Sequence, residues 1–107
     1  MPVKELKSYD EFKAAINGDK VAVIDFWATW CGPCRVIGPV FERISDTPAA
    51  DKIDFYKVDV DAQEKIAQEC KITAMPTFVF FKNGEVVETV LGANPGALNT
   101  AISKHAA

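Results

Sequence analysis

Two cysteines, Cys31 and Cys34, lie three residues apart in the segment Trp30-Cys31-Gly32-Pro33-Cys34 and form the only CxxC motif of the sequence. The apolar periodicity that follows places them at the start of a helix, where free backbone N–H groups and the positive end of the helix dipole favour a thiolate. A thiolate can attack another disulfide, and the neighbouring thiol can then resolve the mixed disulfide. A disulfide across so short a loop would stabilise the fold little, because closing the loop removes little entropy from the unfolded chain. The motif therefore predicts reversible thiol–disulfide chemistry.

Zinc binding is the alternative interpretation of a CxxC motif. Cys31 and Cys34, with Cys70 and His105, make four possible ligands. Structural zinc sites usually take their ligands in two close pairs, whereas Cys70 and His105 are 35 residues apart in the sequence. The pattern therefore favours redox chemistry, and we expect no bound metal or organic cofactor.

Asp25 is the second residue that could do chemistry, because it interrupts the apolar run 21–27 that leads directly into the motif. A buried carboxylate is costly unless it is paired or neutral. Lys57, in the middle of another apolar run, could pair with it if the two strands are neighbours. The alternative is a buried acid of raised pKa that exchanges protons with Cys34. We favour this second interpretation because the strand runs straight into the motif.

Met75-Pro76-Thr77 comes directly before a further apolar run. A proline at this place can simply begin a strand. It can also carry a cis peptide bond in a tight turn. The residue types alone leave both possibilities open.

Helices and strands that could position these residues alternate along the chain. Ser8 and Glu11 have the spacing of a capping box and predict a helix that stops near Gly18. Asp61 with Glu64 predicts a cap for a short helix, and Asn94-Pro95 begins the last helix. The remaining helix follows the motif and contains Pro39, and strands are expected over residues 2–6, 21–27, 53–60, 77–81 and 85–90.

The order of these elements, β-α-β-α-β-α-β-β-α, predicts an α/β fold. Strands that alternate with helices favour parallel pairing through right-handed crossovers. The turn Lys82-Asn83-Gly84 predicts a hairpin, which adds an antiparallel edge to the sheet. The sequence therefore predicts a mixed sheet covered by helices.

The length and composition of the chain exclude several classes of function. The chain has 107 residues, which is one domain; 49% are hydrophobic and 25% are charged, as in ordinary globular proteins. Its 12 basic and 15 acidic residues give a net charge of -3, so nucleic acid is not expected as a partner. No apolar stretch approaches the roughly 20 residues of a membrane span, and the N-terminus lacks the apolar run of a signal peptide. We therefore expect a cytoplasmic protein without a membrane partner.

The chain resembles the thioredoxin family over essentially its whole length. The resemblance is carried by the segment from Asp25 to Cys34 and, further along, by Pro39, Lys57, Asp59, Met75-Pro76-Thr77, Gly84 and Gly92. It implies a single thioredoxin domain over residues 1–107, with a central mixed five-stranded sheet flanked by four helices. It also implies that Pro76 is cis and faces the disulfide. Disulfide-oxidising relatives typically carry histidine where this chain has Pro33, so an oxidase or isomerase is disfavoured.

The resemblance also assigns roles to single residues. Cys31 would be the attacking thiolate and Cys34 the resolving thiol, while Asp25 would accept the proton of Cys34 and Lys57 would modulate Asp25. The substrate-binding surface would consist of apolar or small residues around the motif: Trp30, Gly32, Pro33, Met75, Pro76, Gly92 and Ala93. Such a surface pairs with an extended client segment through its backbone.

The function implied is that of a general protein disulfide reductase. Its partners would be disulfide-containing client proteins and a thioredoxin reductase, a flavoprotein that uses NADPH and FAD, and the chain itself would be a monomer. The alternative is a non-catalytic binding or assembly subunit, which an intact CxxC with a buried acid disfavours. The presence of a cysteine at position 70 is closer to the pattern of animal and fungal members of the family. We interpret Cys70 as a packing residue rather than a redox regulator. His105 is interpreted as a charge partner at the end of the last helix.

Overall fold

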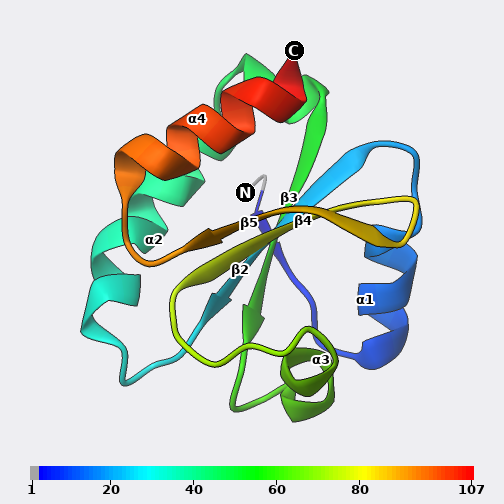
Figure 1. Ribbon diagram of the computed structural model, residues 1–107. Coiled ribbons are helices and arrows are strands. Elements are labelled where there is room, and N and C mark those ends of the chain that lie inside the picture. Colours follow the sequence, from blue (N-terminus) through cyan, green and yellow to red (C-terminus); the bar gives the residue numbers. More distant parts are fainter. Residues whose placement is uncertain (1–2) are drawn as a thin grey trace.

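A five-stranded sheet with the order β1-β3-β2-β4-β5 forms the centre of the computed structural model, which describes residues 3–107 (Figure 1). The strands are β1 (Val3–Glu5), β2 (Val21–Trp27), β3 (Ile53–Asp59), β4 (Thr77–Lys82) and β5 (Glu85–Leu91). The helices are α1 (Tyr9–Ile16), α2 (Gly32–Ser45), α3 (Glu64–Glu69) and α4 (Pro95–Ala106). The predicted element order is confirmed, with an unpredicted 3-10 turn at Pro48–Asp51 between α2 and β3. The expected start of the first strand at Pro2 lies outside the described residues.

Strand β2 is the central strand of the sheet. It pairs in parallel with β3 and antiparallel with β4, and β4 with β5 forms the predicted antiparallel hairpin. Its register places Asp25 beside Lys57 of β3 on one side and Phe78 of β4 on the other. All of β2 except its last residue is buried, as the nearly continuous apolar run predicts for a strand covered on both faces.

Helices cover both faces of the sheet and enclose two apolar cores. Helices α2 and α4 lie on one face and α1 and α3 on the other (Figure 1). On the α2 side, Phe41 packs against Phe55 and Phe78, with ring centroids 5.4 and 5.3 Å apart. On the α1 side, Phe12 meets Phe81 edge to face at 5.8 Å. Alternate residues of β2 point into the two cores, so Asp25 and Trp27 share the α2 side with Val23.

The predicted N-cap residues are confirmed for α1 and α4, but the reciprocal half of the capping box at α1 and the cap at α3 are wrong. Ser8 accepts from the backbone N–H of Glu11 at 3.1 Å, and Asn94 accepts from that of Ala97 at 3.0 Å. At α3 the N-cap is Gln63, which lies two residues after Asp61 and makes no side-chain cap bond. The Asp61 carboxylate accepts from the Trp30 indole N–H at 3.0 Å, and the Asp59 carboxylate accepts from the backbone N–H groups of Asp61 and Ala62 at 2.9 and 3.3 Å.

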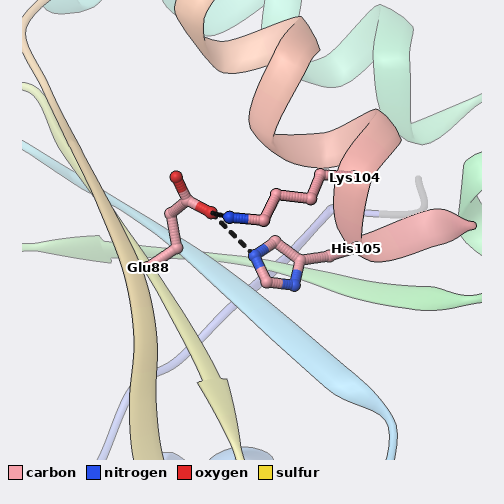
Figure 2. A network of polar contacts seen from close by, with 3 residues as sticks. All are labelled: Glu88, Lys104 and His105. Atoms are coloured by element: carbon pink, nitrogen blue, oxygen red, sulfur yellow. Dashed lines mark hydrogen bonds and ion pairs between the residues drawn. The ribbon is translucent and has the colours of Figure 1, made fainter.

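The C-terminal end of α4 is held to the edge strand by polar contacts with one carboxylate. Glu88 of β5 contacts Lys104 at 3.3 Å and His105 at 2.8 Å, both through its Oε1 atom (Figure 2). The His105 ring also lies 5.2 Å from the ring of Phe80. His105 is thus a hydrogen-bond partner of Glu88 at the end of the last helix, and its role as a charge partner stays a prediction. No helix in residues 3–107 combines the length and apolar character needed to cross a bilayer.

Candidate functional site

Cys31 and Cys34 form a disulfide at the N-terminus of α2, with their Cα atoms 5.3 Å apart. Cys31 is the N-cap residue of the helix, and its Sγ accepts from the backbone N–H of Cys34 at 3.1 Å. Its own N–H donates to the carbonyl of Ala28 at 3.2 Å, which closes the turn between β2 and the helix. When the disulfide is reduced, the same N–H and the helix dipole stabilise a thiolate at Cys31.

Burial alone does not distinguish the two cysteine residues. Cys31 is 4% exposed and Cys34 is 6% exposed. Both belong to a small buried cluster with Ala28, against which Met75 and Trp27 pack. The difference between the cysteines is therefore their place on the helix: Cys31 caps it and Cys34 lies inside its first turn.

The surface around the disulfide is apolar and held in place by hydrogen bonds. Trp30 is 64% exposed, yet its indole is fixed by its bond to Asp61. The loop after β5 meets the loop before β4 where the N–H of Gly92 donates to the carbonyl of Pro76 at 2.9 Å. The peptide bond between Met75 and Pro76 is cis. Gly32, Pro33 and Ala93 are exposed, and Met75 packs against the buried cluster that contains both cysteines.

Asp25 is buried beneath the motif, with only 5% of its surface exposed. Its Oδ1 atom has no hydrogen-bond partner among the described residues. Burial raises the pKa of Asp25 from 3.8 to about 7; the Lys57 ammonium lowers the pKa and the Glu42 carboxylate raises it, both by smaller amounts. Asp25 can therefore both hold and release a proton near neutral pH.

Within the described part of the chain, the structure lacks a close Asp25–Lys57 salt bridge, the interpretation that the sequence disfavours. The two residues are register partners on β2 and β3, but no ion pair joins their side chains among residues 3–107. Instead, the Lys57 ammonium lies 5.8 Å from the centroid of the Trp27 ring, where a cation is attracted to the ring face. Lys57 therefore acts on Asp25 at longer range.

A cavity of about 410 Å³ opens between α2 and the sheet beside Asp25. Its sheet wall includes Asp25, Trp27 and Lys57, and its helix wall includes Cys34 and Glu42. Other lining residues are Val3, Ala28, Thr29, Arg35, Gly38, Pro39 and Phe41. The cavity is large enough to admit water to the Asp25 carboxyl group and to the Cys34 side of the disulfide.

Two charged residues of this cavity, Glu42 and Arg35, are not among the residues predicted from the sequence. Cys34, Gly38 and Glu42 follow one another at intervals of four residues, which places them on one face of a helix. That spacing is the signal in the sequence that points to Glu42.

Cys70 and His105, the remaining candidate zinc ligands, lie apart from the disulfide. Cys70 follows α3 and packs partly buried against the core on the α1 side, and burial raises the pKa of its thiol to about 12. Such a thiol is a weak nucleophile near neutral pH, as a packing role predicts. Within residues 3–107, no group of three or more His, Cys, Asp or Glu residues is arranged to hold a metal ion.

Comparison with known proteins gives consistent matches to thioredoxins. The family model described as Thioredoxin matches residues 3–104. A thioredoxin of Malassezia sympodialis is 67% identical over 98% of this chain and 100% of its own length, and Thioredoxin-1 of Saccharomyces cerevisiae is 49% identical over 97% and 99%. A crystal structure of Malassezia sympodialis thioredoxin superposes with a TM-score of 0.97 at 66% identity, covering 100% of this chain and 96% of that one. A solution structure of oxidised Plasmodium falciparum thioredoxin gives a TM-score of 0.88 at 45% identity, covering 98% and 99%.

Proposed function

Because the chain belongs to the thioredoxin family and is a thiol–disulfide oxidoreductase, we propose that it is a general protein disulfide reductase. The observation that carries the proposal is the Cys31–Cys34 disulfide at the N-terminus of α2, with Cys31 Sγ accepting from the Cys34 N–H. A pair of thiols in this arrangement can give two electrons to a client disulfide and close into a disulfide itself.

In the first step of the proposed reaction, the Cys31 thiolate attacks one sulfur of a client disulfide. A bond forms between Cys31 and that sulfur, the client S–S bond breaks, and the other client sulfur leaves as a thiolate. In the second step Cys34 gives its proton to Asp25 and attacks Cys31 Sγ. The Cys31–Cys34 bond forms, the second client sulfur leaves as a thiolate, and both client thiolates take up protons from solvent or from Asp25.

The roles of the two cysteines follow from the helix terminus. The Cys31 sulfur receives the hydrogen bond of the first turn, so its thiolate is stabilised and is the attacking group. Cys34 faces the cavity that contains Asp25, so it is the group that needs a proton acceptor. Lys57 lowers the pKa of that acceptor from its place on β3.

Client proteins would bind at the apolar rim around the disulfide. Trp30 and Met75 offer apolar contact area, while Gly32 and Gly92 permit a client backbone to come close. The loop that carries Pro76 would pair with an extended client segment by backbone hydrogen bonds. Recognition of backbone rather than side chains suits many different clients.

Recharging of the disulfide would need a partner. We assign this step to a thioredoxin reductase that carries FAD and draws electrons from NADPH, with the chain itself as a cytoplasmic monomer that binds no cofactor. The fungal relatives, Malassezia sympodialis and Saccharomyces cerevisiae thioredoxins, support this assignment.

The test is reduction of insulin disulfides by the full chain in the presence of NADPH and a thioredoxin reductase. The rate is measured as the oxidation of NADPH. Catalytic turnover that is lost in both Cys31→Ser and Cys34→Ser is the expected result. A Cys70→Ser variant is the matched control, because it removes a thiol outside the site. No turnover by the wild-type protein, with the disulfide nevertheless reduced by the reductase, would favour the binding or assembly subunit instead.

A further inference from the structure

Glu42 is a half-buried carboxylate that the reaction outlined above does not use. It lies in the last two turns of α2, on the helix wall of the cavity that contains Asp25. Among the described residues, its carboxylate forms no ion pair and no side-chain hydrogen bond; only its backbone carbonyl accepts, from the Ser45 hydroxyl at 2.6 Å. Its charge therefore acts into the cavity without a close cation to neutralise it.

Three elements pack around Asp25, and two of them, β3 and α2, place charged side chains beside it or on the wall of its cavity. On β3, its register partner is Lys57. On α2, the cavity wall carries Cys34, Arg35 and Glu42, and on β4 the register partner Phe78 has no charge. Arg35 is directed elsewhere, since its guanidinium donates to the carbonyl of Thr29 at 2.7 Å. Lys57 and Glu42 are therefore the two opposite charges that act on Asp25 across the same cavity.

We propose that Glu42 is a positioning residue for the exchange reaction: from the helix wall of the cavity, its carboxylate opposes the Lys57 ammonium and so keeps Asp25 able to carry a proton at neutral pH. The proposal rests on the assignment of Asp25 as the proton acceptor of Cys34. Without Glu42, Lys57 would act alone, and Asp25 would be a weaker base when Cys34 must lose its proton.

The direction of each effect agrees with this arrangement. The Glu42 charge raises the pKa of Asp25 and the Lys57 charge lowers it, while burial is the largest cause of the raised value. A unit charge across a partly hydrated cavity changes a neighbouring pKa by about half a unit to one unit. The effect is therefore large enough to alter the protonated fraction of Asp25 near pH 7.

The test is a titration of the Asp25 carboxyl carbon by NMR in the full oxidised protein. We expect Glu42→Gln to lower the midpoint by about half a pH unit and Lys57→Met to raise it, with the double variant near wild type. Asp19→Asn is the matched control, because it removes the same charge from an exposed loop residue. A Glu42→Gln midpoint equal to that of wild type or of Asp19→Asn would overturn the proposal.

A second measurement separates this proposal from the assignment of Asp25. The rate at which Cys34 resolves a Cys31 mixed disulfide is followed from pH 5 to pH 9 in wild type, Glu42→Gln and Asp25→Asn. The acid limb of the Glu42→Gln profile should move in the same direction as the NMR midpoint. If the resolution rate of Asp25→Asn had the same pH dependence as that of wild type, the assignment of Asp25 as proton acceptor would be wrong. The NMR titration decides separately whether Glu42 changes the pKa of Asp25.

Discussion

Replacement of Asp25 by alanine should stabilise the folded oxidised protein at neutral and alkaline pH. The carboxyl group is buried, and its Oδ1 has no hydrogen-bond partner among residues 3–107. The folded state therefore holds the proton more tightly than the unfolded chain, with a pKa of about 7 against 3.8. Because the pKa is raised on folding, ionised Asp25 destabilises the protein, and this penalty grows as pH rises from the unfolded value through the folded one.

The size of the effect follows from the pKa difference. Each pH unit corresponds to about 1.4 kcal/mol, so a difference of about three units is worth about 4 kcal/mol once Asp25 is fully ionised in both states. Asp25→Ala also loses packing contacts, which lowers the free energy of unfolding of the variant by an amount that does not depend on pH. The free energy of unfolding of the variant minus that of wild type should therefore increase by about 4 kcal/mol between pH 4 and pH 8.

Urea unfolding of both oxidised proteins at each pH from 4 to 8 measures this difference directly. Asp19→Ala is the control, because Asp19 is exposed and makes no ion pair among the described residues. Its difference from wild type should stay nearly constant over the same range. An Asp25→Ala difference that also stays constant, or that shrinks with pH, would refute the burial of an uncompensated carboxyl group.

Two further predictions concern the parts of the fold that hold the sheet and helices together. Gly84→Ala should destabilise the protein by about 1 kcal/mol or more, measured by urea unfolding, because a left-handed backbone disfavours alanine; Gly84 has a φ of +80° and an added Cβ would lie 2.7 Å from the Asn17 side-chain oxygen. Gly38→Ala, where a Cβ meets nothing within 4 Å, is its control and should not destabilise. The hydrogen bonds of Glu88 with His105 and Lys104 lower its pKa, so they stabilise the fold above the unfolded pKa and lose this effect as pH falls through the folded one. Glu88→Gln should therefore have a lower free energy of unfolding than wild type at pH 7, and the difference should become smaller as the pH falls. A difference that stays constant from pH 7 to pH 3 would contradict this.

The fold could be predicted because local signals and apolar patterns agree with it. The capping residue Ser8, the apolar run of β2 and the Asn83-Gly84 turn each act within a few neighbouring residues. Where a side chain has a competing hydrogen-bond partner, the prediction fails. Asp61 accepts from Trp30 rather than capping α3, and Glu11 accepts from the N–H of Lys7 rather than from that of Ser8.

The sequence indicates which candidate site residues lie on neighbouring elements, but not the distances between their side chains. The strand leading into the motif identified Asp25, and neighbouring strands brought Lys57 beside it as expected. Register fixes the backbone positions only, and the long lysine side chain instead places its ammonium over the Trp27 ring. Glu42 was missed because its relation to Asp25 exists only after α2 has packed across the sheet.

The most direct test of the proposed reaction asks which cysteine attacks a client disulfide. Cys34→Ser and Cys31→Ser, both in a Cys70→Ser background, are reduced, mixed with insulin and separated without reductant, and the linked residue is identified by mass spectrometry. Cys31 caps the helix and receives the N–H bond of its first turn, so Cys34→Ser should accumulate a stable mixed disulfide through Cys31. Cys31→Ser should accumulate none. Equal trapping by the two variants, or trapping through Cys34 alone, would contradict the assignment.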